Sequence, residues 1–406
     1  MSSVCVVGLG YIGLPMASML ASRGHQVIGF DVDKNIVDSV NRAQSHFFEP
    51  ELNALLDSAG RTGRLRAQLK PEPADYYIIA VPTPFKEDKK PDLKHVEEAI
   101  AAIAPSLRRG ATIILESTSP VGTTEMVAQK LTALRPDLTF PKFREEGSKF
   151  DVCVAHCPER ILPGLIIEEL VKNDRIIGGM TDACSERAAA LYKTFVTGEC
   201  FVTDCRTAEL VKLVENSFRD VNIAFANELS LVCDHMGIEV WKVIELANKH
   251  PRVNILGPGP GVGGHCIAVD PWFVVDGAPK LTPLIRAARA VNDGKPLVIA
   301  QDIIARAAKF KQPVVACYGI SYKPGVQDIR ESPAIVIVET LLAANIKVVV
   351  CDPVVAALPP ALAQNPLVTH EPVGSAHETA DIVAFLVGHP EFKKLRASDF
   401  ATKVIV

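Results

Sequence analysis

The sequence predicts an α/β protein with two Rossmann-like, doubly wound domains joined by a long central helix. Apolar runs of strand length alternate with helical patterns through the amino-terminal half, and the same alternation begins again near Gln312. Between the two halves, the segment from Thr207 up to Gly237 contains neither Gly nor Pro. Alternating strands and helices are typical of parallel sheets covered on both faces. The uninterrupted segment is about twice as long as an average helix.

The first predicted strand leads into a glycine-rich turn. The apolar run at residues 4–7 is followed by Gly8-Leu-Gly10-Tyr-Ile-Gly13 and then by a helical pattern. In a dinucleotide-binding fold the first glycine makes a tight turn, the second lets a pyrophosphate approach the helix N-terminus, and the third lets the helix pack on the strand. The preceding strand, the following helix and an acid at the end of the next strand all agree, so we expect a dinucleotide site here.

The acid is Asp31, which follows the apolar run at residues 27–30. At this spacing a carboxylate accepts a hydrogen bond from a ribose hydroxyl, and it would repel the 2′-phosphate of NADP. We therefore expect NAD as the cofactor. Lys34 lies close enough in sequence to soften this preference.

Three further apolar runs, at residues 76–81, 111–115 and 151–155, extend the first sheet. Ligand-binding loops in such sheets lie at the carboxyl ends of the strands. Two of these ends carry Pro82-Thr83-Pro84 and the Ser/Thr-rich segment 116–124. Ser, Thr and Pro also supply ordinary turns and helix caps. Their position beside the expected cofactor favours a ligand-binding role.

The central helix carries Lys212, Asn216 and Arg219 at positions i, i+4 and i+7, so these side chains share one face. A solvated polar stripe is the ordinary interpretation of this pattern. Apolar residues such as Phe218 and Phe225 indicate packing around much of the helix circumference, either within the chain or across a subunit interface. A lysine and an asparagine on a mostly buried helix need polar partners.

A glycine-rich segment, Pro258-Gly-Pro-Gly-Val-Gly-Gly-His-Cys266, ends in a cysteine. Glycines allow positive φ and close approach of the backbone to a ligand. We therefore interpret Cys266 as a candidate nucleophile. A small buried thiol beside a turn is the alternative that this segment alone leaves open.

The second α/β unit begins with a strand predicted at residues 313–318. A loop containing Tyr322-Lys323-Pro and Arg330 follows it, and further strands are predicted at 346–352 and 380–389. Lys323 and Arg330 are candidate phosphate ligands because they lie on a loop at a strand end.

Composition narrows the function class. A net charge of −4 without a basic run argues against nucleic acid, and no apolar stretch reaches membrane-spanning length. Ten cysteines in a chain of 406 residues without a signal peptide indicate reduced thiols in a cytoplasmic protein. Cys153 and Cys157 flank His156, but no second ligand pair follows, so no metal is expected.

Seven motifs spread over essentially the whole chain belong together: Gly8-Leu-Gly-Tyr-Ile-Gly-Leu-Pro15, Pro82-Thr-Pro84, Ser117-Thr118 with Pro120-Val-Gly122, Cys157-Pro-Glu159-Arg160, Ala208-Glu-Leu-Val-Lys212 with Asn216, Gly263-Gly-His-Cys266 and Tyr322-Lys323-Pro324. In combination they resemble the UDP-glucose/GDP-mannose dehydrogenase family. That resemblance implies an NAD-binding domain at 1–205, a central helical and dimerisation domain with the cysteine loop at 206–305, and a UDP-sugar-binding domain at 306–406. Family members usually continue past the last strand into an Asp-(Thr/Ala)-(Lys/Arg)-Gly segment, whereas this sequence stops at Lys403-Val-Ile-Val406, so we expect a shortened or unusual end.

Within the family, segments 215–222, 250–256 and 264–273 look like those of members that oxidise UDP-N-acetyl-D-mannosamine. UDP-glucose dehydrogenases usually carry Phe/Leu-Pro-Lys-Asp after the cysteine, whereas this chain has Ile267-Ala-Val-Asp270. We therefore expect UDP-N-acetyl-D-mannosamine as substrate, with UDP-GlcNAc or UDP-GalNAc next and UDP-glucose last. A two-electron β-hydroxyacid-type dehydrogenase and a non-catalytic NAD-sensing protein are remoter alternatives.

The resemblance implies oxidation of the C6 primary alcohol to a carboxylate, with two NAD reduced, through a thiohemiacetal and a thioester on the cysteine. The implied catalytic residues are Cys266, Lys212, Asn216, Asp270, Glu159 and Thr118. The implied cofactor-binding residues are Gly8, Gly10, Tyr11, Ile12, Gly13, Asp31, Thr83, Thr118 and Arg330. The implied substrate-binding residues are Arg160, Ile161, Lys212, Asn216, Arg219, His250, Arg252, Gly263, Tyr322 and Lys323. A homodimer through the central helix is implied as well, with Arg252 reaching across its interface.

Overall fold

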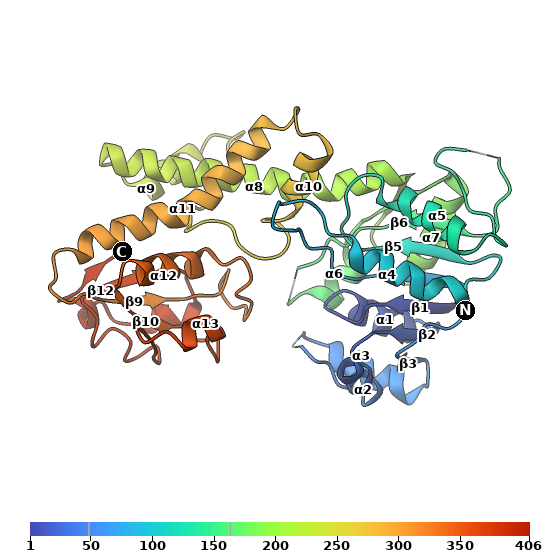
Figure 1. The fold of residues 1–406 in the computed structure, drawn as a ribbon, viewed down its shortest axis with the longest axis horizontal. Coiled ribbons are helices and arrows are strands. Elements are labelled where there is room, and N and C mark those ends of the chain that lie inside the picture. Colours follow the sequence, from blue (N-terminus) through green and yellow to red (C-terminus); the bar gives the residue numbers. More distant parts are fainter. Residues whose placement is uncertain (48, 146, 163) are drawn as a thin grey trace. The chain divides into compact units, whose positions relative to one another are not determined.

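The computed structural model describes residues 1–47, 49–145, 147–162 and 164–406. These residues form two compact units, Met1–Glu215 and Asn216–Val406. The division falls inside the long helix α8 (Cys205–Met236), which Figure 1 labels. Each unit contains a twisted sheet of largely parallel strands with helices packed on it. The predicted α/β fold class, with two Rossmann-like units and a long central helix, is confirmed.

The sheet of the amino-terminal unit has the strand order β3-β2-β1-β4-β5-β6-β7-β8 among the described residues. Its strands are β1 (Ser3–Val7), β2 (Gln26–Phe30), β3 (Leu65–Gln68), β4 (Tyr76–Ile79), β5 (Thr112–Leu115), β6 (Cys153–His156), β7 (Arg175–Gly179) and β8 (Cys200–Asp204). Its helices before α8 are α1 (Gly13–Ser22), α2 (Lys34–Asn41), α3 (Leu52–Arg61), α4 (Lys94–Ile103), α5 (Thr123–Leu134), α6 (Ile166–Lys172) and α7 (Asp182–Tyr192), with a short 3₁₀ turn at Ala104–Ser106. Neighbouring strands are parallel except β6 and β7, which pair antiparallel.

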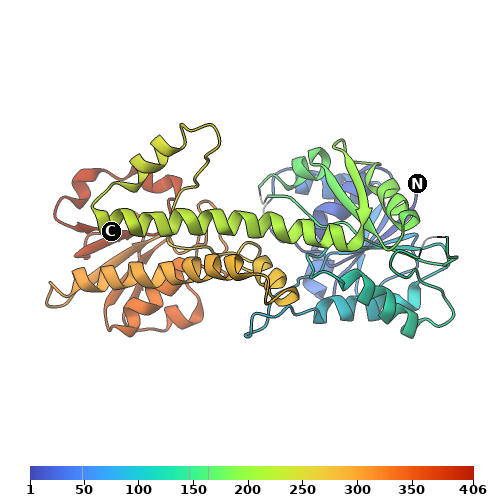
Figure 2. The ribbon, with the colours of Figure 1, turned by 90° about the horizontal axis from the view of Figure 1, so that it is seen from above.

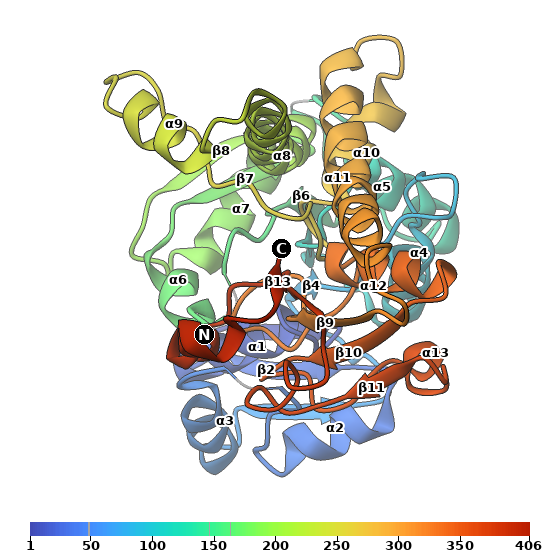
Figure 3. The same cartoon turned by 90° about the vertical axis from the view of Figure 1, so that its left-hand side faces the viewer.

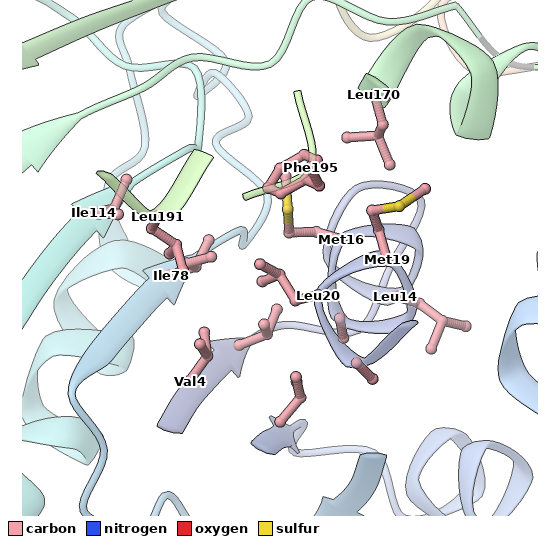
Figure 4. Packing of buried hydrophobic residues seen from close by; sticks show 14 of the residues in the cluster. Val4, Leu14, Met16, Met19, Leu20, Ile78, Ile114, Leu170, Leu191 and Phe195 are labelled. Atoms are coloured by element: carbon pink, nitrogen blue, oxygen red, sulfur yellow. The ribbon is translucent and has the colours of Figure 1, made fainter. Parts of the chain in front are cut away.

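Both faces of this sheet are covered, which explains why its strands are apolar throughout. Along β1, Val4 and Val6 face one core cluster, while Cys5 and Val7 face the other. Figure 4 shows side chains of α1, among them Met16 and Leu20, gathered in the first cluster together with Val4. Successive strand residues point to opposite faces, so a continuous apolar run serves two cores at once.

The sheet of the carboxyl-terminal unit has the order β11-β10-β9-β12-β13 and is parallel throughout its described pairs. Its strands are β9 (Val314–Tyr318), β10 (Lys347–Cys351), β11 (Val368–His370), β12 (Ile382–Phe385) and β13 (Val404–Ile405). Its helices after α8 are α9 (Val240–Ala247), α10 (Asp270–Gly277), α11 (Pro283–Ala307), α12 (Pro333–Ala343) and α13 (Pro360–Ala363), with 3₁₀ turns at Pro390–Lys394 and Ala397–Phe400. Figure 3 shows α11 and α12 beside this sheet.

The long helix α11 runs alongside the second half of α8, as Figure 2 shows. Buried polar pairs join them. Arg289 of α11 forms an ion pair of 2.7 Å with Asp220 of α8, and the amide of Asn227 donates to Asn292 Oδ1 at 2.9 Å. These buried polar contacts hold the two helices in a defined register.

The uninterrupted segment predicted from Thr207 is helical and extends over Cys205–Met236. Apolar side chains of this helix are divided between buried and exposed positions, and Leu213 is 1% exposed. Phe218 is 73% exposed and Phe225 is 56% exposed, so the described part of the single chain leaves these two side chains largely uncovered. Within the described residues, no helix is long and apolar enough to cross a membrane.

Candidate functional site

The glycine-rich turn after β1 has the geometry that its sequence predicts. Gly8 has φ of +89°, and its N–H donates to Phe30 O at 2.8 Å. A Cβ on Gly13 would lie 1.8 Å from Gly8 O, so this position needs glycine for helix–strand packing. A Cβ on Gly10 would meet no atom within 4 Å. The backbone at Gly10 is therefore open to a pyrophosphate, and the turn fits the dinucleotide that the sequence predicts.

Asp31 lies at the end of β2, directly beside this turn. Its Oδ2 accepts the N–H of Leu9 at 2.8 Å and its Oδ1 accepts the N–H of Asp33 at 2.9 Å. Each carboxylate oxygen has a second lone pair that can accept a ribose hydroxyl. The ammonium of Lys34, which could favour a 2′-phosphate, pairs with Asp38 on α2 at 2.5 Å. This pairing within α2 weakens the case for NADP.

Further predicted cofactor residues lie on the loops around the turn. Tyr11 is 49% exposed and stacks on Phe47 with ring centroids 4.2 Å apart. Ile12 immediately precedes α1. The hydroxyl of Thr83 donates to Thr118 O at 2.5 Å, so the structure joins the loops that follow β4 and β5.

The loop containing Thr118 is fixed to the start of α8 by a buried carboxylate. Glu209 is fully buried, and its two oxygens accept the N–H groups of Gly122 and Thr124, each at 2.7 Å, and the hydroxyl of Thr124 at 2.6 Å. Burial raises the pKa of Glu209 to about 7, although these hydrogen bonds oppose the shift. Half-buried Lys212 follows one turn later on the same helix. Glu209 thus sets the spacing between the Thr118 loop and Lys212.

A second buried polar cluster surrounds Glu159. Arg175 is 1% exposed and pairs with Glu159 Oε2 at 2.8 Å, while Glu159 Oε1 accepts the N–H of Arg160 at 2.6 Å. The hydroxyl of Tyr192 donates to Glu116 at 2.7 Å. Burial and the nearby charge of Glu159 raise the pKa of Glu116 to about 8, while the charge of Arg175 and the hydrogen bond from Tyr192 oppose the shift. Glu116 is therefore easier to protonate than an ordinary carboxyl group.

His156, the last residue of β6, and Cys157, which follows it, are also fully buried. Burial lowers the pKa of His156 to about 3, so its imidazole is neutral. Burial also raises the pKa of the Cys157 thiol far above its ordinary value, which makes Cys157 a poor nucleophile. We therefore expect neither His156 nor Cys157 to act as a nucleophile or a base.

Arg160 is paired within the amino-terminal unit. Its guanidinium meets the carboxylate of Glu215 twice, at 2.6 and 3.1 Å, and also donates to Asp174 O at 3.3 Å. Ile161 follows it and is partly buried. A ligand phosphate at Arg160 would have to share the guanidinium with Glu215.

Cys266 differs from the other cysteines. All ten lie among the described residues; Cys266 alone is exposed, Cys200 is partly buried and the remaining eight are buried. The carbonyl of Cys266 accepts the N–H groups of Val269 and Asp270, both at 2.9 Å, which forms a tight turn into α10. The exposed position of the thiol matches the requirement of a nucleophile and contradicts the alternative of a buried structural thiol.

The structure brings Asn216 and Asp270 together. Asp270 is the first residue of α10 and is 3% exposed, and the amide of Asn216 donates to its Oδ2 at 2.5 Å. Because Cys266 lies only one turn before Asp270, this bond fixes the cysteine loop to α8 within the carboxyl-terminal unit. Arg219, on the same helix, is exposed.

The glycines before Cys266 pack against the loop that follows β9. A Cβ on Gly263 would lie 2.5 Å from Glu331 O, and one on Gly264 would lie 2.9 Å from the ring of Tyr322. Gly264 also has φ of +82°, and its N–H donates to Arg330 O at 3.0 Å. These glycines therefore allow close packing of two chain segments, in addition to any role in approaching a ligand.

This packing places the predicted nucleotide-binding residues beside the cysteine loop. Arg330 pairs with Asp328 at 2.6 Å and lies 3.2 Å from His265 Nδ1. The ammonium of Lys323 lies 5.8 Å from the centre of the Tyr322 ring.

The remaining predicted substrate residues, His250 and Arg252, are exposed on the segment that follows α9. The side chain of Asn248 closes this segment by bonding to the backbone of Ile255 twice, at 2.7 and 3.0 Å. His250 Nδ1 accepts the N–H of Arg252 at 3.4 Å.

Sequence reasoning missed Arg175 and Tyr192, which fix the two buried carboxyl groups. Arg175 opens the otherwise apolar run Arg175-Ile-Ile-Gly-Gly, and a charged residue at the start of a buried strand is a signal that could have identified it. Tyr192 ends α7 and carries no such signal. In the part of the chain that the structure describes, no group of three or more His, Cys, Asp or Glu could hold a metal ion.

Comparison with known proteins covers the whole chain. Sequence models of the UDP-glucose/GDP-mannose dehydrogenase family match residues 2–196 as its NAD binding domain, 206–294 as its central domain and 316–406 as its UDP binding domain. A relative from Ralstonia nicotianae, an NDP-N-acetyl-D-galactosaminuronic acid dehydrogenase, is 54% identical over 405 residues, which cover 100% of this chain and 95% of the relative. The UDP-N-acetyl-D-mannosamine dehydrogenase of Yersinia pestis is 51% identical over 413 residues, covering 100% of this chain and 97% of that protein.

A solved structure agrees with these relatives. The UDP-D-ManNAc dehydrogenase of Pyrococcus horikoshii superimposes with a TM-score of 0.87 at 39% identity, covering 99% of this chain and 93% of that one. Three family domains match the chain, and the relatives share about half of its residues. The geometry of the turn after β1 agrees with the NAD binding domain among them. The chain belongs to the UDP-glucose/GDP-mannose dehydrogenase family and is an NAD-dependent nucleotide-sugar dehydrogenase.

Proposed function

We propose that this protein oxidises the C6 primary alcohol of UDP-N-acetyl-D-mannosamine to the carboxylate, giving UDP-N-acetyl-D-mannosaminuronate in a four-electron reaction. The observation that carries the proposal is the exposed Cys266 thiol on a turn fixed by the Asn216–Asp270 bond. A simple two-electron alcohol dehydrogenase has no use for such a thiol. A covalent route to the acid requires one.

The cofactor is held by the turn after β1 and the loops around it. The residues proposed to bind NAD are Gly8, Gly10, Tyr11, Ile12, Gly13, Asp31, Thr83, Thr118 and Arg330. The first and third glycines shape the turn, Gly10 leaves room for the pyrophosphate, and Asp31 accepts a ribose hydroxyl. When bound, NAD supplies the hydride acceptor for both oxidations.

Cys266 acts on the aldehyde that the first oxidation produces. Its thiolate adds to the C6 carbonyl and forms a thiohemiacetal, so the aldehyde stays on the protein. Oxidation of that adduct leaves a thioester, and attack by water releases the carboxylate and restores the thiol. The thioester step distinguishes this proposal from the β-hydroxyacid-type alternative.

Lys212 and Asn216 lie one helical turn apart on α8 and act on the C6 oxygen. The amine of Lys212 and the amide of Asn216 polarise that oxygen and stabilise the negative charge that develops in the tetrahedral species. Asp270 orients Asn216 directly through their 2.5 Å hydrogen bond. Glu159 and Thr118 share the hydrolytic water, with Arg175 fixing the carboxylate of Glu159.

The UDP-sugar is held by residues from three parts of the chain. The residues proposed to bind it are Arg160, Ile161, Lys212, Asn216, Arg219, His250, Arg252, Gly263, Tyr322 and Lys323. Residues 1–205, 206–305 and 306–406 form the NAD-binding, central and UDP-sugar-binding domains in this proposal. The ranges matched by the three family domains support that division.

A homodimer through α8 completes the proposal. Exposed apolar side chains recur along this helix in steps of four and seven, which places them on one face. They are 42% to 73% exposed and comprise Leu210, Val214, Phe218, Phe225, Val232 and Met236. A stripe of this length on one helix matches a self-complementary interface with the same helix of a second copy.

One other substrate has a specific observation in its favour. The Ralstonia relative, at 54% identity, is named for N-acetyl-D-galactosaminuronic acid, which is derived from the C4 epimer of N-acetylglucosamine. The second candidate function is therefore the same oxidation of UDP-N-acetyl-D-galactosamine.

The test is kcat/KM measured with UDP-N-acetyl-D-mannosamine, UDP-N-acetyl-D-galactosamine, UDP-N-acetyl-D-glucosamine and UDP-glucose under saturating NAD. The proposal expects the first sugar to be preferred by at least about tenfold, equal to about 1.4 kcal/mol of transition-state discrimination. Preference for the galactosamine sugar would replace the first candidate by the second. Preference for UDP-glucose would contradict both.

A further inference from the structure

The two units begin their sheets with the same backbone turn. In the amino-terminal unit, Gly8 has φ of +89° and donates its N–H to Phe30 O at 2.8 Å. In the carboxyl-terminal unit, Gly319 has φ of +88° and donates its N–H to Cys351 O at 2.7 Å. The carboxyl-terminal unit therefore repeats the turn that fits a pyrophosphate in the amino-terminal unit.

The acid that follows the second strand is repeated as well. Asp31 Oδ2 accepts the N–H of Leu9 at 2.8 Å, and Asp352 Oδ2 accepts the N–H of Ile320 at 2.7 Å. In both units the other carboxylate oxygen accepts the backbone N–H two residues further along the chain, at 2.9 Å. Asp352 is thus the counterpart of the residue that faces a ribose in the dinucleotide site.

The two acids differ in what surrounds them. The side chain of Asp352 is fully buried, and fully buried His389 places its Nε2 3.3 Å from Asp352 Oδ2. The same nitrogen lies 3.1 Å from Ser321 Oγ. Since His389 Nδ1 accepts the N–H of Gly325 at 3.2 Å, the ring proton is on Nε2 and points toward Asp352 and Ser321. His389 therefore occupies the place where a ribose would meet the acid.

The pair holds both ends of the loop that follows β9. Asp352 accepts the N–H groups of Ile320 and Ser321 at 2.7 and 3.1 Å, and His389 accepts that of Gly325. Inside the loop, Ser321 Oγ donates to Lys323 O at 3.1 Å. Removing the imidazole would take the acceptor from Gly325 N–H and a neighbouring donor from the buried Asp352 carboxylate and the Ser321 hydroxyl. Asp352 would still hold the N–H groups of Ile320 and Ser321, so the Gly325 end of the loop is the end that is released.

We propose that Asp352 and His389 are positioning residues that hold segment 320–325 in the one conformation in which Tyr322 and Lys323 meet the UDP part of the substrate. This inference rests on the proposed function, because that function assigns Tyr322 and Lys323 to UDP. In the carboxyl-terminal unit, Asp352 therefore positions segment 320–325, whereas its counterpart Asp31 is proposed to bind a ribose.

The test uses the full chain and measures two affinities by calorimetry, that for UDP and that for NAD. His389→Leu removes both contacts of the imidazole, and the loop then visits its binding conformation only part of the time. The UDP affinity is expected to fall about tenfold or more, in proportion to the fraction of molecules that keep that conformation. NAD affinity is expected to stay within about twofold, because all the residues proposed to bind NAD except Arg330 lie in the amino-terminal unit, and Arg330 lies outside segment 320–325.

Conservative variants separate positioning from general damage. His389→Asn keeps an acceptor near the place of Nδ1 and is expected to restore part of the UDP affinity that His389→Leu loses. His370→Gln, at an exposed position on β11, is the control and is expected to change neither affinity. If His389→Leu does not fold, Ser321→Ala removes the hydroxyl's contacts with the imidazole and with Lys323 O, and it is expected to lower UDP affinity by a smaller factor.

Unchanged UDP affinity in folded His389→Leu, or equal losses of UDP and NAD affinity, would overturn the inference. Failure of the unmodified protein to bind UDP would instead count against the proposed function. Hydrogen exchange keeps the two apart, since it needs no ligand. The amides of Ser321 and Gly325 are expected to exchange at least about tenfold faster in His389→Leu, and unchanged exchange would refute the positioning role whether or not UDP binds.

Discussion

Replacing Glu209 by Gln is expected to destabilise the amino-terminal unit by about 1–2 kcal/mol. One oxygen of this buried carboxylate accepts two donors from Thr124, and the other accepts the N–H of Gly122. Glutamine can keep the first oxygen as an acceptor, but it then presents an NH₂ group to the Gly122 N–H. One hydrogen bond is lost and two donors face each other. Glu209→Ala removes all three bonds and is expected to cost about 3–5 kcal/mol, because several buried donors lose their partners.

Glu125→Gln provides a matched control, because Glu125 also links α5 to α8, but at the surface of the protein. Glu125 of α5 pairs with Arg206 of α8 at 2.5 Å, and the arginine side chain is 52% exposed. Solvent screens such a pair, so its loss is expected to cost no more than about 1 kcal/mol. Urea unfolding followed by circular dichroism gives the free energy of unfolding of all three variants in the same buffer. Equal losses for Glu125→Gln and Glu209→Ala would refute the reasoning that burial makes Glu209 the stronger link.

The remaining predictions concern catalysis, pH and assembly. Cys266→Ser is expected to permit the first oxidation but to slow acid formation by at least about a thousandfold, and unchanged acid production would exclude covalent catalysis by this thiol. Lys212→Ala is expected to lower kcat much more than it raises KM, whereas a rise in KM alone would make Lys212 a substrate anchor. Buried His156 has its pKa lowered from 6.5 to about 3. The unfolded chain therefore binds its proton first, and stability is expected to fall as pH drops below 6.5, by up to about 1.4 kcal/mol per pH unit. In His156→Gln this contribution should vanish, and an unchanged pH dependence in urea unfolding would contradict it. Phe218→Arg is expected to convert the dimer to a monomer in analytical ultracentrifugation, while an unchanged sedimentation coefficient would show that α8 is not the interface.

Much of the fold follows from local sequence pattern. The strand predicted at residues 313–318 is observed at Val314–Tyr318, and the helix predicted from Thr207 is observed at Cys205–Met236. Apolar runs and glycine-rich turns act over a few residues, so they can be recognised without tertiary information. The exposure of Phe218 could not be recognised in this way. The sequence pattern of an apolar helix face does not distinguish a face that packs inside the chain from one that packs against a second copy.

Only those parts of the candidate site whose residues lie close together in the sequence could be predicted from it. The turn at Gly8 and the acid Asp31 lie close in sequence and obey a known spacing, so both could be located. The contact of Arg175 with Glu159 and that of His389 with Asp352 join residues from separate strands and loops. No spacing rule connects such residues. Only the folded sheet brings them into contact, so their roles emerge from the structure.

The most direct test of the central claim is the amount of NADH formed per molecule of UDP-N-acetyl-D-mannosamine consumed under saturating NAD. The proposed mechanism requires two oxidations at C6 before release, and it therefore predicts two NADH and one carboxylate per sugar, without free aldehyde. One NADH per sugar, with aldehyde in solution, would contradict the thioester route through Cys266.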